Sequence, residues 1–598
     1  MKRKGSTMIW DGLLGKFLIW RNRHLSNRQF IFLLSVIIGV FSGLAAVFLK
    51  NAVFVVHNLI FKRQPVDNLN LLYFILPLAG ILITVLFVSV LIREDLSHGI
   101  SRILFSISKQ TGKLKPHNTY SSFVGSILTV AFGGSVGLEA PIALTGSAIG
   151  SNFGRILRLN YKTTIILIGC GASGAIAGIF KAPIAAVLFS LEVLMLDLTL
   201  WSIIPLLISS ITSLTISYFF LGKAEIFSFE LSEPFILARI PWYIVLGIFC
   251  GLISLYFTRG VLFIESLFAR IKNTFYKALV GGWLLGLIIL ALPPLFGEGY
   301  DALDSLLNGT PVEITHGSLF YGIQDNMLVF GVFLVLILIF KVVATAITIG
   351  AGGVGGIFAP SLFMGGIGGY FMARIINFVS FNSVSERNFS LVGMAGVMAG
   401  VMHAPMTAIF LIAEITGGYG LLMPLILTAV ISFITILYFE PHSIYTVRLA
   451  KKGELITHHK DKAILTLMDM GKVIEVDFTV LSPNDKLADL VEAIARSKRN
   501  IFPVVSQGML VGIVLLDDIR HIIFNTDMYH VTYVRDLMIL PPAHVSPDDP
   551  MEDVMKKFEE TGSWNLPVIK NGKYVGFLSK SKLFTVYRKW LLDITADE

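Results

Sequence analysis

The segment Gly353-Val-Gly-Gly-Ile-Phe-Ala-Pro360 has a related counterpart, Gly134-Ser-Val-Gly-Leu-Glu-Ala-Pro141, which lies 219 residues earlier in the chain. A second matched pair follows in each half, Ile176–Glu192 and Met398–Glu414, with an offset of 222 residues. Convergence of glycine- and alanine-rich packing helices is the alternative, but the shared Ala-Pro pairs and final glutamates favour an internal repeat. Interrupted helices in matching positions of two halves point to a substrate site.

The composition predicts that this repeat lies in a membrane. The 598 residues are 54% hydrophobic and 15% charged, with a mean hydropathy of +0.75, far more apolar than soluble domains. Crossing the hydrocarbon core takes about 20 apolar residues, and the uncharged stretches of that length are 68–92, 198–222, 278–297, 342–373 and 415–439. Shorter uncharged stretches predict helices that stop partway or pack inside the bundle; they are 140–154, 163–180 and 326–340.

Charge predicts the orientation and the domain limits. Residues 1–28 carry seven Lys or Arg against one acidic residue and do not resemble a cleavable signal, which predicts a cytoplasmic N-terminal segment. We expect a transmembrane domain over 29–450, with repeats at roughly 70–225 and 280–445, and a cytoplasmic domain over 451–598. A multi-pass protein of the cell membrane, with both termini in the cytoplasm, is the expectation.

The predicted cytoplasmic domain contains its own repeat. Phe502–Gly512 is similar to Leu566–Gly576 at an offset of 64 residues, and each copy reads as strand, tight turn and strand before a helical pattern. Two such units, roughly 470–527 and 532–590, predict one small α/β domain.

The glycine- and proline-containing blocks offer what an anion path through a membrane needs. A helix N-terminus attracts an anion through its free N–H groups and a partial positive charge of about 0.5, without the cost of a buried lysine. Glycine allows close approach of the backbone, and proline is tolerated in the first helical turn. Glu139 stands between Gly137 and Pro141, where its carboxylate can occupy an anion position or be protonated and swing away. Such a group acts as a gate; the alternative is a capping glutamate with no transport role.

On these residues the chain resembles the CLC chloride channels and proton-coupled chloride transporters over roughly residues 30–450, and its tail resembles the CBS-domain pair that many of them carry. Gly356–Pro360 fits the G-x-F-x-P motif in full, Gly137–Pro141 fits G-[KR]-E-G-P at Gly, Glu and Pro, and His442–Tyr445 supplies the pore tyrosine. The resemblance implies an α-helical polytopic membrane fold, an inverted repeat with broken helices, followed by a small α/β CBS-pair domain.

The resemblance also implies a site. The anion would be held by the backbone N–H groups of Ile357 and Phe358, beside Gly356, and by the hydroxyl of Tyr445, with Glu139 as the gating glutamate. The pore motifs around these groups contribute Gly137, Pro141 and Pro360. A homodimer with a separate pore in each subunit is implied as well.

Two departures from the family motifs bear on mechanism. The G-S-G-I-P motif reads Ser97-His98-Gly99-Ile100-Ser101, so His98 takes the place of an anion-contacting serine; its imidazole is either a hydrogen-bond donor to the anion or a surface or capping group. Proton-coupled members have a second glutamate one position after the one matching Glu192, and here that position is Val193. Valine cannot relay a proton, which favours channel-like or uncoupled conduction over proton-coupled antiport, although Asp197 is a possible proton entry. Glu192 and its counterpart Glu414 are predicted to be structural groups at a helix packing site.

The tail departs from its family too. CBS sites that hold adenine nucleotides use a Ser or Thr with an Asp three residues later, whereas the first unit has Leu515 with Asp518 and the second has Ser579 with Lys582. A structural or dimer-stabilising tail is therefore favoured over nucleotide regulation.

Other classes of function find little support in the sequence. The chain has no Walker motif, metal-ligand cluster or nucleophile motif, which argues against an enzyme and against a required cofactor. Its two cysteines, Cys170 and Cys250, imply neither a disulfide framework nor a thiolate metal site. A CBS-regulated cation transporter is the more distant alternative and would need several carboxylates in the membrane body. The expected partners are the lipid bilayer, chloride as substrate and a second copy of the chain, and no nucleic acid.

Overall fold

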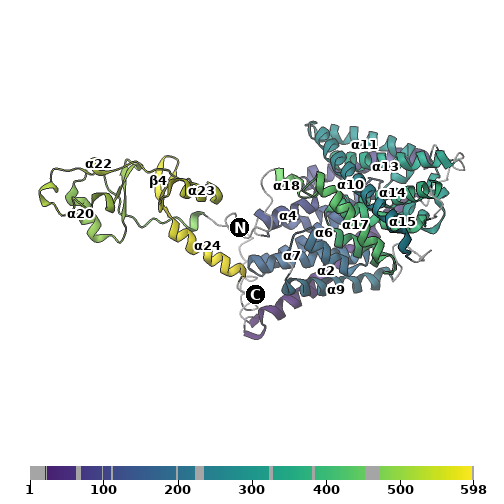
Figure 1. Cartoon of the computed structure of the whole chain (residues 1–598), viewed down its shortest axis with the longest axis horizontal. Coiled ribbons are helices and arrows are strands. Elements are labelled where there is room, and N and C mark those ends of the chain that lie inside the picture. The colour runs from purple at the N-terminus through teal and green to yellow at the C-terminus, as the bar shows by residue number, and fades with distance from the viewer. Residues whose placement is uncertain are drawn as a thin grey trace, which may run out of the picture. The chain divides into compact units, whose positions relative to one another are not determined.

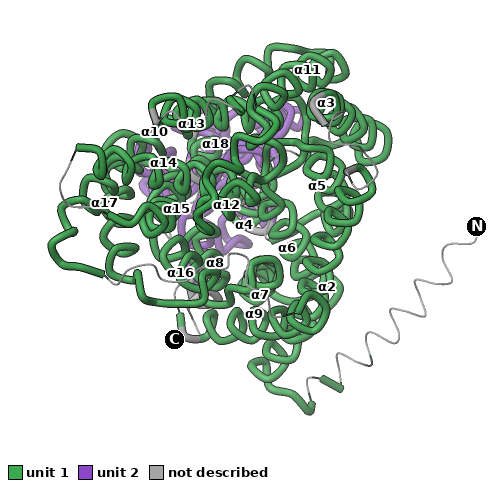
Figure 2. Tube along the Cα trace, turned by 90° about the vertical axis from the view of Figure 1, so that its right-hand side faces the viewer, with its two compact units in different colours: residues 1–455 green, residues 456–598 purple. Residues whose placement is uncertain are grey.

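The structure is a computed structural model that describes residues 16, 20–21, 23–61, 69–96, 98–109, 112–196, 199–222, 235–318, 320–321, 327–379, 384–451 and 470–595. The chain divides into two compact units, Met1–Leu455 and Ile456–Glu598, coloured separately in Figure 2. The described part of the first unit is helical, and that of the second combines short strands with helices (Figure 1).

The first unit is a bundle of helices that packs around one large apolar core. The helices of its first half are α2 (Asn27–Phe61), α3 (Leu69–Phe87), α4 (Gly99–Lys109), α5 (Ser121–Val130), α6 (Glu139–Ile156), α7 (Tyr161–Phe180), α8 (Pro183–Glu192) and α9 (Leu200–Leu221). Those of its second half are α10 (Ile240–Ala269), α11 (Thr274–Ala291), α12 (Tyr300–Asn308), α13 (Met327–Gly350), α14 (Phe358–Val379), α15 (Glu386–Met402), α16 (Pro405–Ile415), α17 (Leu422–Phe439) and α18 (Val447–Lys451).

Within the described residues, nine helical segments are long and apolar enough to cross a membrane. The uncharged stretch 342–373, predicted as a single crossing, is not one: it holds the end of α13, a glycine-rich break and the start of α14. The stretches 163–180 and 326–340, predicted to stop partway or to pack inside the bundle, belong to the full-length candidate spans Tyr161–Phe180 and Leu328–Gly350, and the first of these is mostly buried inside the bundle. An uncharged window therefore located apolar sequence but not the backbone breaks within it.

The two glycine-rich blocks meet at the centre of this unit. Gly137 and Gly356 form an antiparallel bridge in which each N–H donates to the carbonyl oxygen of the other, at 2.8 and 2.7 Å. Thr129 accepts the N–H of Val354 at 2.9 Å, and Thr348 accepts the N–H of Ser135 at 3.2 Å. Such reciprocal pairs are the mark of a two-fold relation between the repeats.

The same reciprocity fixes how the helices cross. A Cβ added to Gly146 in α6 would lie 2.0 Å from the carbonyl oxygen of Gly171 in α7, and one added to Gly171 would lie 1.9 Å from that of Gly146. In the second repeat, Gly365 in α14 and Gly393 in α15 each leave only 2.3 Å to the other's oxygen. Because no side chain fits, these four glycines let the backbones touch, as small residues do in membrane helix pairs.

The second unit is built from two hairpins with helices. Strand β1 (Ile501–Ser506) pairs with β2 (Met509–Leu515), and β3 (Asn565–Lys570) pairs with β4 (Lys573–Ser579). The turns Gln507-Gly508 and Asn571-Gly572 have positive φ at both residues, the requirement of a type I′ hairpin turn. Its helices are α20 (Leu487–Arg496), α21 (Leu516–Ile519), α22 (Val534–Leu537), α23 (Met551–Thr561) and α24 (Lys580–Thr595).

The two hairpins exchange their flanking segments. Glu475, which precedes the first hairpin, bridges Phe577 in β4 of the second hairpin. Ile539, which precedes the second hairpin, bridges Ile513 in β2 of the first. The exchange ties the two hairpins into one domain.

Asp549 illustrates the local caps of this domain: the Ser546 N–H, at 3.0 Å, and the Lys557 ammonium, at 2.9 Å, lower the pKa of its carboxyl.

Candidate functional site

A small cavity lies beside the bridge between the two glycine-rich blocks. Its walls come from segments far apart in the sequence: His98–Ser101 at the start of α4, Gly355–Ile357 before α14, and Tyr445 with Arg448 near α18. The cavity volume is about 30 Å³, above the roughly 10–15 Å³ that a water-sized species needs. The site can therefore hold a small ion or water.

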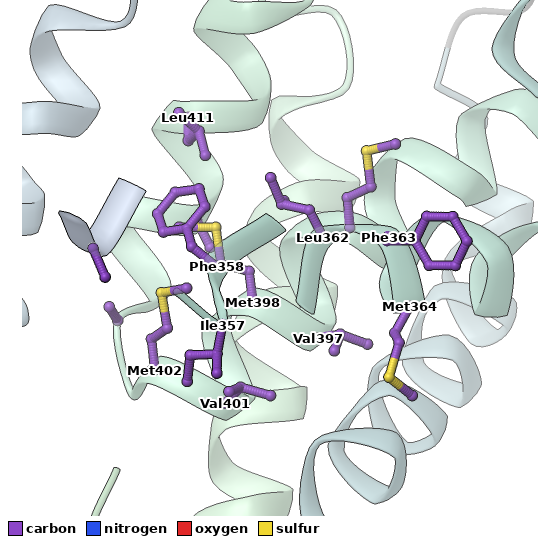
Figure 3. Packing of buried hydrophobic residues seen from close by; sticks show 14 of the residues in the cluster. Ile357, Phe358, Leu362, Phe363, Met364, Val397, Met398, Val401, Met402 and Leu411 are labelled. Atoms are coloured by element: carbon purple, nitrogen blue, oxygen red, sulfur yellow. The ribbon is translucent and has the colours of Figure 1, made fainter. Parts of the chain in front are cut away.

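Helix α14 begins beside this cavity, because the residue before its first residue, Ile357, lines the cavity. The N–H groups of the first residues of a helix have no carbonyl partner within the helix, and Ile357 and Phe358 stand at that position. Figure 3 shows their side chains among buried apolar neighbours that include Met398 and Met402. Phe358 also stacks on Phe180, with ring centroids 4.9 Å apart. Ile357 lines the cavity, whereas Phe358 is one residue further along and does not.

Gly356 differs in what it can offer. It lines the cavity, but its N–H already donates to the carbonyl oxygen of Gly137. Its contribution is the close backbone approach, since a Cβ there would lie 2.8 Å from the Cβ of Ala140. The predicted role of Gly356 in anion binding stays a prediction, and its N–H is engaged in the bridge to Gly137. Pro141 and Pro360 both lie buried in the first turns of α6 and α14.

Tyr445 and His98 complete the walls on the side of α4 and α18. Tyr445 is 7% exposed, and its backbone carbonyl accepts the hydroxyl of Ser101 at 2.8 Å, which ties the two segments together. His98 is half-buried and lines the cavity with Arg448. Arg448 also pairs with Glu265 of α10 at the cavity edge.

Glu139 is the first residue of α6 and is 2% exposed. Its carboxylate folds back over Gly137, because a Cβ on that glycine would lie 1.9 Å from Glu139 Oε2. Oε1 accepts the hydroxyl of Tyr300 at 2.8 Å, while Oε2 has no hydrogen-bond donor in the part of the chain that is described. The cavity is lined not by Glu139 itself but by the next residue, Ala140.

Residues 80–436, more than half of the chain, match the family described as voltage gated chloride channel. The chain belongs to that family. Residues 471–525 and 534–589 match the CBS domain, so the resemblance and the fold class predicted from the sequence are confirmed.

Relatives of this chloride channel family member include both channels and exchangers by their names. A putative chloride channel protein ClcB-like from Ralstonia nicotianae is 25% identical over 362 residues, 60% of this chain and 80% of that protein. An H(+)/Cl(-) exchange transporter ClcA from Vibrio cholerae is 27% identical over 318 residues, 51% of this chain and 64% of that protein. The chain also spans 52% of the chloride channel protein CLC-f of Arabidopsis thaliana, at 27% identity.

Solved structures share the fold. A slow cyanobacterial Cl-/H+ antiporter matches with a TM-score of 0.61 and 24% identity over 72% of this chain and 98% of that one. A eukaryotic CLC transporter matches with a TM-score of 0.58 and 18% identity over 92% and 97%. The second match extends over most of this chain, which is consistent with the CBS-domain pair.

Of the positions that bear on a proton route, Val193 and Glu192 lie in the described part of the chain and Asp197 does not. Val193 is 4% exposed at the end of α8. Beside it, the Glu192 carboxylate accepts the N–H groups of Met406 and Thr407 at 3.1 and 2.7 Å. Asp197 lies outside the described residues, as does Ser97. Glu192 thus has the helix-packing contact that the sequence predicts for it.

The predicted nucleotide positions in the CBS pair lie in different units. Asp518 is exposed on α21, whereas Ser579 ends β4 and is 6% exposed. The Ser579 hydroxyl accepts the N–H of Lys582 at 3.2 Å and so caps the start of α24. Each of the two CBS repeats therefore has only one residue of the Ser/Thr and Asp pair.

Several polar groups at the site were missed from the sequence. Tyr300, Glu298 and Lys341 surround the Glu139 carboxylate or the loop before it. A signal for Lys341 existed, since it is the one charge that separates the uncharged stretches 326–340 and 342–373. Nothing in the spacing of Tyr300 relates it to Glu139, because the contact spans 161 residues.

Proposed function

We propose that this protein moves chloride or a similar small anion through a CLC-like pore that Glu139 gates. Membership of the chloride channel family supports the coarse function. The observation that carries the finer proposal is the cavity beside the Gly137–Gly356 bridge, which both Ile357, the residue before α14, and Tyr445 line.

An anion that enters this cavity must give up water of hydration. Inside a low-dielectric bundle, backbone N–H groups and a neutral tyrosine hydroxyl replace hydration without a full opposite charge. Binding is then strong enough for entry and weak enough for release. We propose that the N–H groups of Ile357 and Phe358 and the Tyr445 hydroxyl act in this way, with His98 as a further donor.

Glu139 fits a gate because it is buried at the start of α6, next to Ala140, which lines the cavity. Its charge competes with an anion for the positive end of that helix. When the carboxylate is protonated, this attraction is lost and the side chain is released. Anion passage then follows the departure of Glu139 from its place over Gly137.

Val193 supports conduction without proton coupling. A buried valine has no proton to exchange, and the neighbouring Glu192 is engaged by the N-terminus of α16. The alternative is a proton-coupled antiporter that uses another route, with Asp197 as its entry. A cation transporter is less well supported, since the described residues contain no group of three or more His, Cys, Asp or Glu placed to hold a metal.

The organisation predicted from the sequence belongs to the same proposal. We propose a homodimer in the cell membrane with both termini in the cytoplasm, a transmembrane domain over 29–450 and a structural CBS-pair domain over 451–598. Light scattering in detergent should give twice the chain mass of 65.8 kDa; a mass of one chain would contradict the dimer.

The experiment is chloride efflux from proteoliposomes, with the pH outside recorded at the same time and Glu139→Ala run alongside. We expect wild-type efflux without stoichiometric proton uptake, and faster efflux from Glu139→Ala. Stoichiometric proton movement would favour the antiporter alternative. Absence of anion efflux from both proteins would overturn the proposal.

A further inference from the structure

A buried lysine in the membrane bundle has no part in the function proposed above. Lys341 lies within α13 and is 0% exposed. Its ammonium donates to the Ser135 hydroxyl at 3.0 Å and to the carbonyl oxygens of Gly297 and Glu298 at 3.3 and 3.4 Å. A charged group inside a membrane protein is costly and usually marks a functional position.

The contacts of Lys341 join two loops that both lead to the gate. Ser135 belongs to the loop that runs into α6 and Glu139, and Gly297–Glu298 run into α12 and Tyr300. The loops also touch directly, since the Gly297 N–H donates to the Gly133 carbonyl oxygen at 3.3 Å. Lys341 therefore fixes the position of one loop against the other.

The second loop in turn holds the gating residue from two sides. The Glu298 carboxylate accepts the N–H of Leu138, the residue before Glu139, at 3.1 Å. The Tyr300 hydroxyl donates to the Glu139 carboxylate at 2.8 Å. The backbone just before the gate and the side chain of the gate are thus both bound by a segment of four residues, Gly297–Tyr300.

We propose that Gly297–Tyr300 is a latch that holds Glu139 over Gly137, with Tyr300 as the positioning residue and Lys341 as the anchor of the latch. The inference rests on the proposed function and adds a specific barrier to it. The gate opens when the Tyr300–Glu139 hydrogen bond breaks, and protonation of Glu139 favours that step because a phenol donates more strongly to a carboxylate than to a neutral acid.

The charges around Glu139 determine whether the gate opens at higher or lower pH once the Tyr300 hydroxyl is removed. Tyr300 of α12 donates to Glu139, and Tyr445 before α18 and the Glu298 carboxyl interact with it electrostatically. Lys341 of α13 and Lys50 of α2 act on Glu298 in turn. Removing the Tyr300 hydroxyl leaves all of these charges in place and deletes one donor to the ionised gate. The ionised, closed form loses stability, so opening requires less acid.

The test is anion efflux from proteoliposomes as a function of pH, with equal pH on both sides. For Tyr300→Phe we expect the pH of half-maximal efflux to rise by about one unit, the size of one hydrogen bond to a charged group. In a Glu139→Ala background the same substitution should change nothing. Tyr243→Phe is the matched control, because Tyr243 is a buried tyrosine that stacks on Phe389, and it should leave the pH profile unchanged.

A milder variant tests the anchor. Ser135→Ala removes one acceptor of Lys341 and leaves its two carbonyl contacts, so we expect a shift in the same direction but smaller than that of Tyr300→Phe. An unshifted Tyr300→Phe profile, in a protein whose Glu139→Ala variant conducts faster, would overturn the latch. An unshifted Ser135→Ala profile would remove Lys341 from it. Failure of the anion function itself would appear differently, as no efflux from wild type and Glu139→Ala alike.

Discussion

At the residue scale, the absence of one methyl group decides where the gate carboxylate can lie. Glu139 folds back over Gly137, and the space it fills is the space that a Cβ on this residue would take. The glycine at position 137 is therefore explained by Glu139, two positions later. This relation was implicit in the motif, but the sequence indicated only a close backbone approach.

Gly137→Ala should displace the gate without removing it. Overpacking of this kind costs about 1–3 kcal/mol, which corresponds to a change of roughly five-fold or more in the balance between closed and open gate. We expect faster anion efflux at neutral pH than in wild type, measured in proteoliposomes. The matched control is Gly356→Ala, whose added Cβ meets Ala140 rather than a carboxylate. Equal efflux from the two variants would contradict the account.

The individual residues of the site differ in how well they could be predicted. Ile357, Tyr445 and His98 were found because each belongs to a motif, and the structure brings all three to one cavity. Tyr300 and Glu298 could not be found in this way, because their partners are 161 and 160 residues away and no local pattern encodes such a contact.

At the scale of elements, the paired glutamates show how the repeat stabilises itself. The Glu192 carboxylate at the end of α8 accepts N–H groups at the start of α16. The Glu414 carboxylate, near the end of α16, accepts the N–H groups of Ile184 and Ala185 at the start of α8, at 3.0 and 2.9 Å. Each helix therefore caps the other. The sequence predicted a packing role for both residues but not the exchange of partners.

Glu192→Ala and Glu414→Ala should have similar effects, because each carboxylate accepts two N–H groups of the other helix; Glu192 accepts the Thr407 hydroxyl as well. Loss of a helix N-terminal cap costs about 0.5–2 kcal/mol, so we expect each variant to lower the melting temperature of the purified protein in detergent by a few degrees. Neither should alter the ratio of protons to anions moved. If Glu192→Ala alone changed that ratio with an unchanged melting temperature, Glu192 would be a proton carrier and not a cap.

The ends of the helices could not be predicted from hydropathy. Hydropathy identified apolar segments, yet 342–373 contains the break at which the site forms. Helix α13 ends at Gly350, the chain turns at Gly352 with a φ of +104°, and Val354 then gives its N–H to Thr129 of the other repeat. Contacts of this kind depend on the fold as a whole and leave no mark in the hydropathy of either segment.

At the scale of the whole molecule, the membrane unit and the CBS pair carry different parts of the account. The CBS pair has two well-formed hairpins but divides its nucleotide-type residues, Asp518 and Ser579, between the two units. The Ser579 hydroxyl is used in its own helix cap. A structural role for this domain requires no ligand.

We therefore expect no binding of adenine nucleotides to the full-length protein. Isothermal titration calorimetry with ATP and with AMP should give only heats of dilution, and neither nucleotide should change anion efflux. Saturable heat from either one, or a change in efflux that depends on its concentration, would show that the CBS pair is regulatory.

We propose that an anion binds where the two glycine-rich blocks meet, in competition with the Glu139 carboxylate. Bromide soaked into crystals of the protein can be located there by its anomalous X-ray scattering. We predict a bromide peak in the cavity between Ile357 and Tyr445 in wild type, and a second peak in Glu139→Gln at the position that the carboxylate leaves. Bromide bound elsewhere, with neither position occupied, would contradict the account.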